Sequence, residues 1–198
     1  WTLTGEMRMA RWSNDAVTLK NGKALFPGGS IGFTTVPPLD SAELYDPSTG
    51  RFAPTRNSLS VGRHAFGISI LRDGRVLITG GSVVGNSLNG NGVTAVDLFD
   101  PDTSEFRPMA HMHDGRSLHA QVSLRDGRVV VIGGAQTSCE IYDPETNQWT
   151  VLSGRLPTRL KDMKAFELFD GRIFIAGGQD TADGVTTCLL YTSPSPRD

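Results

Sequence analysis

The sequence lacks the features that mark several large protein classes. Its 198 residues contain 2 cysteines, 4 histidines and no apolar run that approaches the length of a membrane-spanning helix. No long segment repeats its apolar residues with the 3.6-residue period of an amphipathic helix. These absences argue against a transmembrane segment and against a helical fold. No targeting signal opens the sequence, and because the chain starts inside a repeated unit at Trp1, the compartment stays unknown.

The chain also lacks an excess of charge of either sign. It carries 19 Lys and Arg residues against 21 Asp and Glu residues, for a formal net charge of −2. No basic field is therefore available to hold a nucleic acid or an anionic membrane surface. We expect neither as a partner.

Glycine and proline are abundant, and the glycines recur in pairs. The 23 glycines and 11 prolines indicate many turns between short strands within one domain of ordinary size. Paired glycines begin at positions 28, 80, 133 and 177, so successive pairs lie 52, 53 and 44 residues apart. Six residues before each pair stands the glycine of an Asn-Gly or Asp-Gly dipeptide, the strongest short signal of a β-hairpin. These four glycines are Gly22, Gly74, Gly127 and Gly171.

Residues 116–150 show one complete unit of this repeat. An alternating segment at 119–124 precedes the Asp126-Gly127 turn, and an apolar run at 129–132 precedes the glycine pair. A third short strand at 138–142 leads through Asp143-Pro144 into a fourth strand centred on Trp149. The aromatic-Asp-Pro motif and a second aromatic seven residues later recur in three units: Tyr45 with Phe52, Phe99 with Phe106, and Tyr142 with Trp149. The sequence therefore predicts repeated four-stranded antiparallel sheets.

This set of columns resembles the kelch repeat, whose units form the blades of a β-propeller. The resemblance implies an all-β fold with about three and a half blades, at approximately 7–55, 56–110, 111–154 and, in part, 155–187. A blade lies between two neighbours, so its inner strands should be apolar on both faces, as 76–78 and 129–132 are. Since propellers usually close with four to eight blades, we expect an incomplete arc and not a closed ring.

The last eleven residues, 188–198, break the repeat pattern. Their sequence, CLLYTSPSPRD, resembles a translated sequencing adapter, and we expect this tail to be non-native. Cys139 is then the only genuine cysteine, and one thiol cannot form an internal disulfide. Its column otherwise holds Ala42 and Val96, which predicts an inert buried thiol.

Two charged columns recur at fixed offsets. Arg11, Arg63 and Arg116 each precede the turn glycine by eleven residues, and Leu160 takes that position in the fourth unit. In kelch domains that capture acidic peptides, arginines at this position reach the ligand, so the resemblance makes these three candidate ligand-binding residues. Packing in the seam between blades is the alternative. The acidic column Glu43, Asp97 and Glu140 recurs in every full unit and is interpreted as structural, pairing with the basic residue after each turn: Lys23, Arg75, Arg128 and Arg172.

Histidines and loops supply the remaining candidates. His111 and His113 flank Met112 in a loop without a nearby third ligand, so no metal site is expected, and His119 is interpreted as structural. Long insertions follow the first two glycine pairs, at 30–40 and 82–93, where a rigid scaffold often carries its binding residues.

The favoured function is a binding module that recognises a protein or an acidic ligand through the loops connecting its blades. No catalytic residue and no cofactor is assigned. The alternative is a copper-radical oxidase resembling galactose oxidase, or another glycan-active kelch propeller, with its catalytic residues in blades outside this sequence. That chemistry requires tyrosine and histidine ligands and a cysteine crosslinked to tyrosine. The only candidate tyrosines here, Tyr45 and Tyr142, belong to the repeated turn columns.

Overall fold

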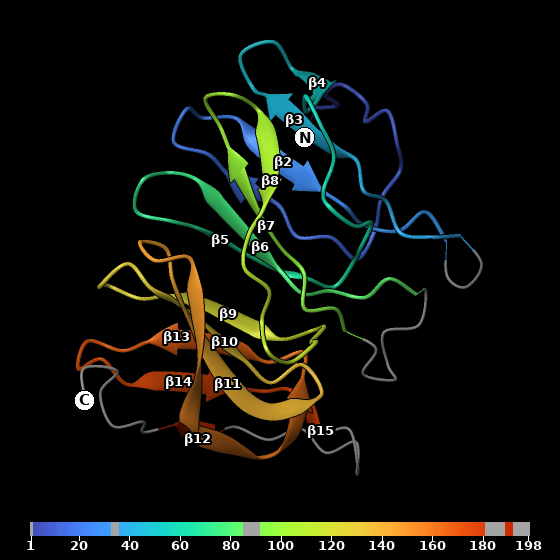
Figure 1. The fold of residues 1–198 in the computed structure, drawn as a ribbon. Coiled ribbons are helices and arrows are strands. Elements are labelled where there is room, and N and C mark those ends of the chain that lie inside the picture. The colour runs from blue at the N-terminus through green and yellow to red at the C-terminus, as the bar shows by residue number, and fades with distance from the viewer. Residues whose placement is uncertain (1, 33–35, 85–91, 181–188, 192–198) are drawn as a thin grey trace.

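The computed structural model describes residues 2–32, 36–84 and 92–180, together with the backbone of 189–191. Every regular element in these ranges is a β-strand (Figure 1), and none of the described residues forms a helix that could cross a membrane. The predicted all-β class is confirmed. The described ranges leave out Trp1, residues 33–35 and 85–91 of the two insertions, and residues 181–188 and 192–198 at the end of the chain.

The strands form successive antiparallel sheets in chain order. The first sheet contains β1 (Val17–Thr18), β2 (Ala24–Pro27), β3 (Ala42–Asp46) and β4 (Arg51–Pro54). The second contains β5 (Gly67–Ile70), β6 (Val76–Thr79), β7 (Val96–Asp100) and β8 (Glu105–Pro108). The third contains β9 (Ala120–Ser123), β10 (Val129–Ile132), β11 (Gln136–Asp143) and β12 (Gln148–Lys161), with β15 (Gln179–Asp180) added beside β12. The fourth contains β13 (Lys164–Glu167), β14 (Ile173–Ala176) and β16 (Leu189–Tyr191).

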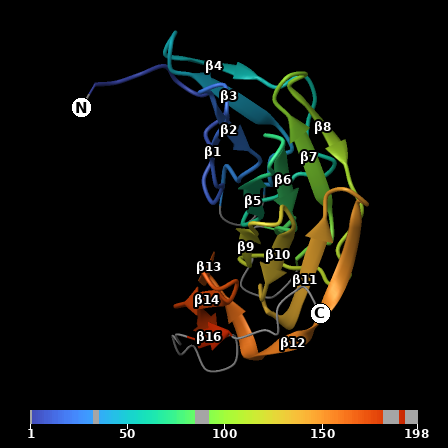
Figure 2. The same ribbon diagram turned by 90° about the vertical axis from the view of Figure 1, so that its left-hand side faces the viewer.

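The sheets fan along a curve (Figure 2). Their first strands, β1, β5, β9 and β13, pack side by side on the concave side, and the fourth strands lie on the convex side. The first and fourth sheets are not joined in the described part of the chain, so the arrangement is the predicted partial propeller and not a closed ring.

Each seam between neighbouring sheets holds its own hydrophobic core. Alternate residues of one strand serve different seams because side chains along a strand point to opposite faces. In β6, Val76 and Ile78 pack towards the first sheet, whereas Leu77 packs towards the third. In β10, Val129 and Val131 face the second sheet, and Val130 and Ile132 face the fourth. This double burial explains why the inner strands are continuous apolar runs.

The longest strand, β12, was not predicted. The sequence predicted only a short strand around Trp149, but β12 continues to Lys161, past the expected blade boundary at 154. No insertion follows the third glycine pair, so β11 begins at Gln136 and keeps pairing with β12 through register shifts as far as Leu160. Leu160 and Lys161 then pair with β15, so that β12 carries the chain from the third sheet to the fourth.

The tail residues 189–191 form β16, whose backbone pairs with β14. That pairing places them as the third strand of the fourth sheet and does not test whether the tail is native.

Candidate functional site

The three candidate arginines point into the protein. The side chains of Arg63 and Arg116 are fully buried, and that of Arg11 is 1% exposed. Each forms an ion pair with the acidic residue of the third strand in its own sheet: Arg11 with Glu43 at 2.9 Å, Arg63 with Asp97 at 2.7 Å, and Arg116 with Glu140 at 2.6 Å. The acidic column is structural, as predicted, but its predicted partners are wrong.

The basic residues after the turns pair elsewhere. Arg75, Arg128 and Arg172 bind the aspartate of their own turn, at 2.6, 2.6 and 2.7 Å, and Lys23 pairs with Asp46 at 3.2 Å. Distance explains these pairings. The turn aspartate is only two residues from the arginine that follows the turn, so the local ion pair forms. The acidic column lies at the other end of the sheet, beside Arg11, Arg63 and Arg116.

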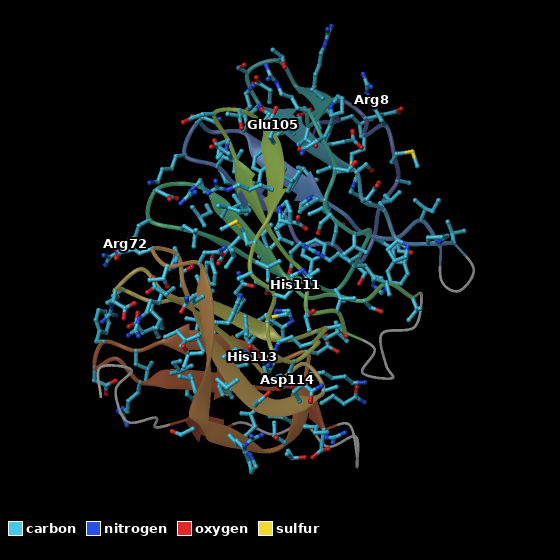
Figure 3. All side chains as sticks on the ribbon, in the orientation of Figure 1. Arg8, Arg72, Glu105, His111, His113 and Asp114 are labelled. Carbon is cyan, nitrogen blue, oxygen red and sulfur yellow. The ribbon has the colours of Figure 1, made fainter. Side chains whose placement is uncertain are left out.

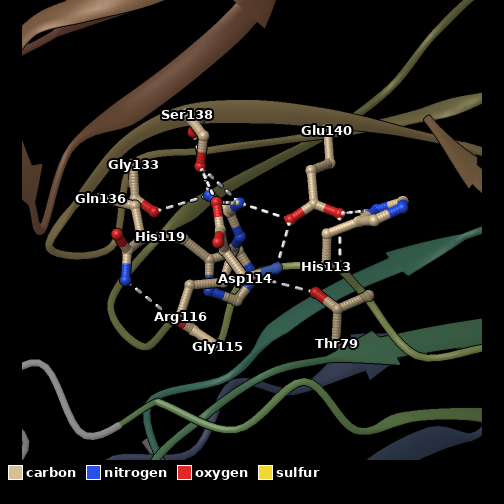
Figure 4. Close-up of polar contacts among 10 residues, drawn as sticks. All are labelled: Thr79, His113, Asp114, Gly115, Arg116, His119, Gly133, Gln136, Ser138 and Glu140. Atoms are coloured by element: carbon tan, nitrogen blue, oxygen red, sulfur yellow. Dashed lines mark hydrogen bonds and ion pairs between the residues drawn. The ribbon is translucent and has the colours of Figure 1, made fainter. Parts of the chain in front are cut away.

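The third unit shows the arrangement around one arginine (Figure 4). Arg116 donates to Glu140 Oε1 at 2.6 Å, to Gly133 O at 2.8 Å and to Ser138 O at 3.0 Å. Glu140 also accepts the backbone N–H groups of His113 and Asp114, at 2.7 and 3.0 Å. Burial alone would raise the pKa of Glu140, but these backbone hydrogen bonds and the Arg116 guanidinium together lower it below its ordinary value. The pair therefore fastens the connecting loop to the glycine turn and the third strand.

The backbone of the arginine column has a second role. The carbonyls of Arg63, Arg116 and Leu160 accept the N–H of the second glycine in the preceding unit, at 3.0, 2.9 and 2.8 Å. Leu160 thus occupies the arginine position of the fourth unit without its side-chain chemistry. A ligand-binding role for Arg11, Arg63 and Arg116 stays a prediction, and their burial and their ion pairs with the acidic column favour the alternative of seam packing.

Two residues after each arginine position, the chain adopts the same unusual conformation. Ser13, Ala65, Leu118 and Asp162 have φ values of 53°, 54°, 54° and 55°, in the left-handed region that non-glycine residues seldom occupy. Their backbones form a chain of hydrogen bonds from sheet to sheet. Ala65 N donates to Ser13 O at 2.9 Å, Leu118 N to Ala65 O at 2.8 Å, and Asp162 N to Leu118 O at 2.9 Å. We call these four residues the inner arc.

A cavity of about 230 Å³ opens beside the inner arc, and we call it the mouth cavity. It lies where the first strands of the four sheets begin. Its lining consists of the inner arc and the residues that follow it: Asn14, Asp15, Phe66, His119, Met163 and Lys164. Phe66 and Met163 are buried, while Asp15, Asp162 and Lys164 are exposed. The cavity therefore has an apolar floor and a charged rim.

His119 is the polar group set deepest in this lining. Gln121 Nε2 donates to Leu77 O and to Ser69 Oγ, at 3.3 and 2.7 Å, so its Oε1 faces Thr79. Thr79 Oγ1 donates to that oxygen at 2.5 Å and can only accept from His119 Nε2, which lies 2.8 Å away. The chain of hydrogen bonds therefore fixes His119 as the tautomer protonated on Nε2.

The imidazole of His119 is also held neutral. Burial, and then the charges of Arg116 and Arg63, lower its pKa to about 3 from an ordinary 6.5. The network joins the second and third sheets across their seam. His119 is structural, as predicted, and at neutral pH it adds no positive charge to the mouth cavity.

The other histidines form no metal centre with their neighbours. His111 and His113 lie with Asp114 on the connection into the third sheet (Figure 3), and their Nδ1 atoms face Thr94 Oγ1 at 3.1 Å and Glu140 Oε2 at 3.0 Å. Within the described ranges, no group of three or more His, Cys, Asp or Glu side chains is placed to hold a metal ion.

The described residues also do not fit a copper-radical site. Cys139 is buried in the core between the third and fourth sheets, whereas Tyr142 packs on the opposite face of β11. Burial raises the pKa of Cys139 to about 11, which keeps it a thiol. A cysteine–tyrosine crosslink between these two residues is therefore excluded by geometry.

The insertions begin from fixed points. Ser30 forms a backbone bridge with Trp12, and Ser82 forms one with His64, at 2.8–3.1 Å. His64 Nε2 also contacts Val84 O at 2.8 Å. Residues 33–35 and 85–91 lie outside the described residues, so a binding role for the insertions stays a prediction.

Comparison with known proteins agrees with this architecture. Galactose oxidase from Gibberella zeae is 28% identical over 134 residues, which cover 63% of this chain and 17% of that protein. Kelch-like protein 23 from Homo sapiens is 26% identical over 188 residues, covering 93% of this chain and 31% of that protein. Kelch-like protein 36 from Mus musculus is 29% identical over 163 residues, covering 79% and 25%. The chain therefore spans between 17% and 31% of the length of these relatives.

A solved structure shares the fold. The structure of YjhT superimposes with a TM-score of 0.75 at 15% sequence identity, over 98% of this chain and 70% of that one. No protein-family model matches the chain. The repeated columns and the fanned four-stranded sheets give the chain a kelch-type β-propeller fold, and its sequence is similar to those of kelch-repeat proteins.

Proposed function

We propose that this kelch-repeat chain is an interaction module that binds a segment of a partner protein at the mouth cavity. The observation that carries the proposal is the contrast between constant backbone and varied side chains. The φ values of the four inner-arc residues lie within 2° of one another, yet their side chains all differ: Ser13, Ala65, Leu118 and Asp162.

Residues that build the repeat keep their type, as the glycine pairs do in all four units and the arginine–acid pairs do in three. Positions that keep only their backbone are free to differ, and a rigid scaffold with differing side chains is the usual form of a recognition site. Non-glycine residues held at positive φ also cost conformational energy, which is typical of functional sites. The curated relatives named as Kelch-like proteins support an interaction module more than an enzyme.

The proposal does not extend to an acidic ligand. That expectation depended on three arginines, and each is occupied by a buried carboxylate. It does not extend to the oxidase either. The described residues supply no copper-radical site, and the stretch related to galactose oxidase covers 17% of that protein.

Selection from a library of random displayed peptides tests the proposal, with Ala65→Leu as the blocking variant. Leu118 has the same φ as Ala65, so leucine is compatible with this backbone, and its side chain would fill the cavity. We expect Ala65→Leu to lower the affinity for the selected peptides at least tenfold. Lys20→Ala, at the opposite end of the sheets, should leave this affinity unchanged. Peptides that bind equally to Ala65→Leu and lose affinity with Lys20→Ala would contradict the proposal.

A further inference from the structure

We infer that the mouth cavity is selective for a basic side chain, lysine or arginine, presented by the partner segment. This inference rests on the proposed function and names the chemistry of its ligand. It depends on three properties of the cavity: the charge that remains unpaired there, the position of its apolar floor, and the protonation state of His119.

The three buried arginines near the cavity are each paired with a carboxylate. Arg11, Arg63 and Arg116 are matched one for one by the acidic column, at 2.6–2.9 Å. His119 is neutral, because Thr79 Oγ1 accepts its Nε2–H and Nδ1 has no acceptor for a second proton. None of these groups therefore contributes net charge to the opening.

The charges that remain are on the rim. Asp15, Asp162 and Lys164 line the cavity, and within the described part of the chain none of the three forms an ion pair within 4.0 Å. Two carboxylates and one ammonium give the opening a net charge of −1. An incoming cation is favoured over an anion, and the preference should weaken as salt is added.

The floor lies between the two rim acids. Asp15 lies on the approach to the first sheet and Asp162 on the approach to the fourth, while the floor residues Ala65, Phe66 and Leu118 precede the second and third sheets. Lysine and arginine combine an alkyl stem with a charged head, so the stem can cover the apolar floor while the head stays near a carboxylate at the rim. A carboxylate side chain would meet two like charges at the rim.

A pair of small probes tests the inference directly. Butylguanidinium and pentanoate share a four-carbon alkyl group and differ in the sign of the charge. We expect butylguanidinium to cause saturable chemical-shift changes at the amides of Ala65, Phe66 and Leu118, and pentanoate to cause none. Equal or stronger binding of pentanoate, or no response to butylguanidinium, would overturn the inference.

Isosteric variants assign the effect to the rim. Asp15→Asn and Asp162→Asn remove one charge each, and asparagine suits the left-handed backbone at 162. Each substitution should lower the affinity for butylguanidinium roughly two- to fivefold, as expected for the loss of a partly exposed ion pair. Lys164→Gln is the matched control, and it should leave the affinity unchanged or strengthen it. Unchanged affinity in both aspartate variants would contradict the inference.

The peptide selection separates this inference from the proposed function. Peptides enriched in lysine or arginine, and blocked by Ala65→Leu, support both. Peptides blocked by Ala65→Leu without basic enrichment leave the proposed function standing and overturn the basic-ligand inference. Peptides that Ala65→Leu does not block count against the proposed function itself.

Discussion

The two ends of the fanned sheets join neighbouring units by different means. At the loop end, where the connections and glycine pairs lie, the inner arc links the sheets by backbone hydrogen bonds of 2.8–2.9 Å. At the turn end, long basic side chains reach from one unit over the next. Lys20 Nζ donates to Arg72 O at 2.6 Å, Arg72 lies over Gly127, and Arg125 donates to Phe169 O at 2.9 Å (Arg72 is labelled in Figure 3).

This difference separates two kinds of contact between neighbouring units of one fold. The turn-end contacts are made by exposed side chains, so solvent and salt weaken them and their residue type must be kept. The loop-end contacts use main-chain atoms and buried ion pairs, which leaves the side chains of the inner arc free to differ. This freedom is the reason that the proposed binding site is at the loop end.

The largest expected effect is the loss of a buried ion pair at the loop end. Asp97→Asn leaves the Arg63 guanidinium fully buried without its counter-charge. We expect the free energy of unfolding, measured with urea, to fall by about 3–5 kcal/mol.

Asp73→Asn provides the turn-end control for that measurement. It breaks the partly exposed pair with Arg75 and should cost at most about 1 kcal/mol. Asparagine is compatible with this turn, since Asn21 occupies the same place in the first unit and accepts Lys23 N at 3.1 Å. Losses of similar size in the two variants would erase the distinction between the two ends.

Two glycines with positive φ give the next comparison. Gly80, at φ +58°, lies against Arg116 O, so a Cβ would collide with that carbonyl. Gly171, at φ +85°, has no atom within 4 Å of the same position. Gly171→Ala should cost about 1–2 kcal/mol from the backbone alone, and Gly80→Ala roughly 2 kcal/mol more from the collision. Thermal or urea unfolding measures both, and equal costs would show that the sheets do not approach as described.

A smaller effect concerns pH. The folded-state pKa of His119 is lowered to about 3, so below pH 6.5 the unfolded chain binds a proton that the folded chain does not. Stability should fall between pH 6.5 and 4.5 by on the order of 1 kcal/mol per pH unit. Glu140, whose pKa is lowered, loses its stabilising charge only below its ordinary 4.5.

His119→Met separates the two contributions, because Met163 is the native residue at the equivalent position of the fourth unit. Urea midpoints at pH 7 and pH 5 should differ in the native chain and nearly coincide in the variant. A slope that survives the substitution would assign the pH dependence to other groups.

The sequence predicted the parts of the fold that repeat by residue type. Asn-Gly and Asp-Gly turns, glycine pairs and double-faced apolar strands each follow from local chemistry, and all lie where the spacing indicated. Leu59, Met112 and Leu156, which each lie fifteen residues before a turn glycine, are buried against the glycine pairs of the preceding units.

Two features of the site could not be predicted. Arg63 pairs with Asp97, which is 34 residues away in the sequence. The repeat spacing alone did not show whether Arg63 or Arg75 is the partner of Asp97. The inner arc has no residue signature, because Ser13, Ala65, Leu118 and Asp162 share only a backbone conformation. A constant offset of two residues from the arginine column was the only signal available.

Amide hydrogen exchange at the inner arc is the most direct test of the central claim, which is that backbone hydrogen bonds join the sheets at the loop end. Asp162 is exposed and lies in a connection, yet its N–H donates to Leu118 O at 2.9 Å. We predict that the amides of Ala65, Leu118 and Asp162 exchange slowly and at similar rates. Rapid exchange at all three, at the rate of an unstructured loop, would contradict the account.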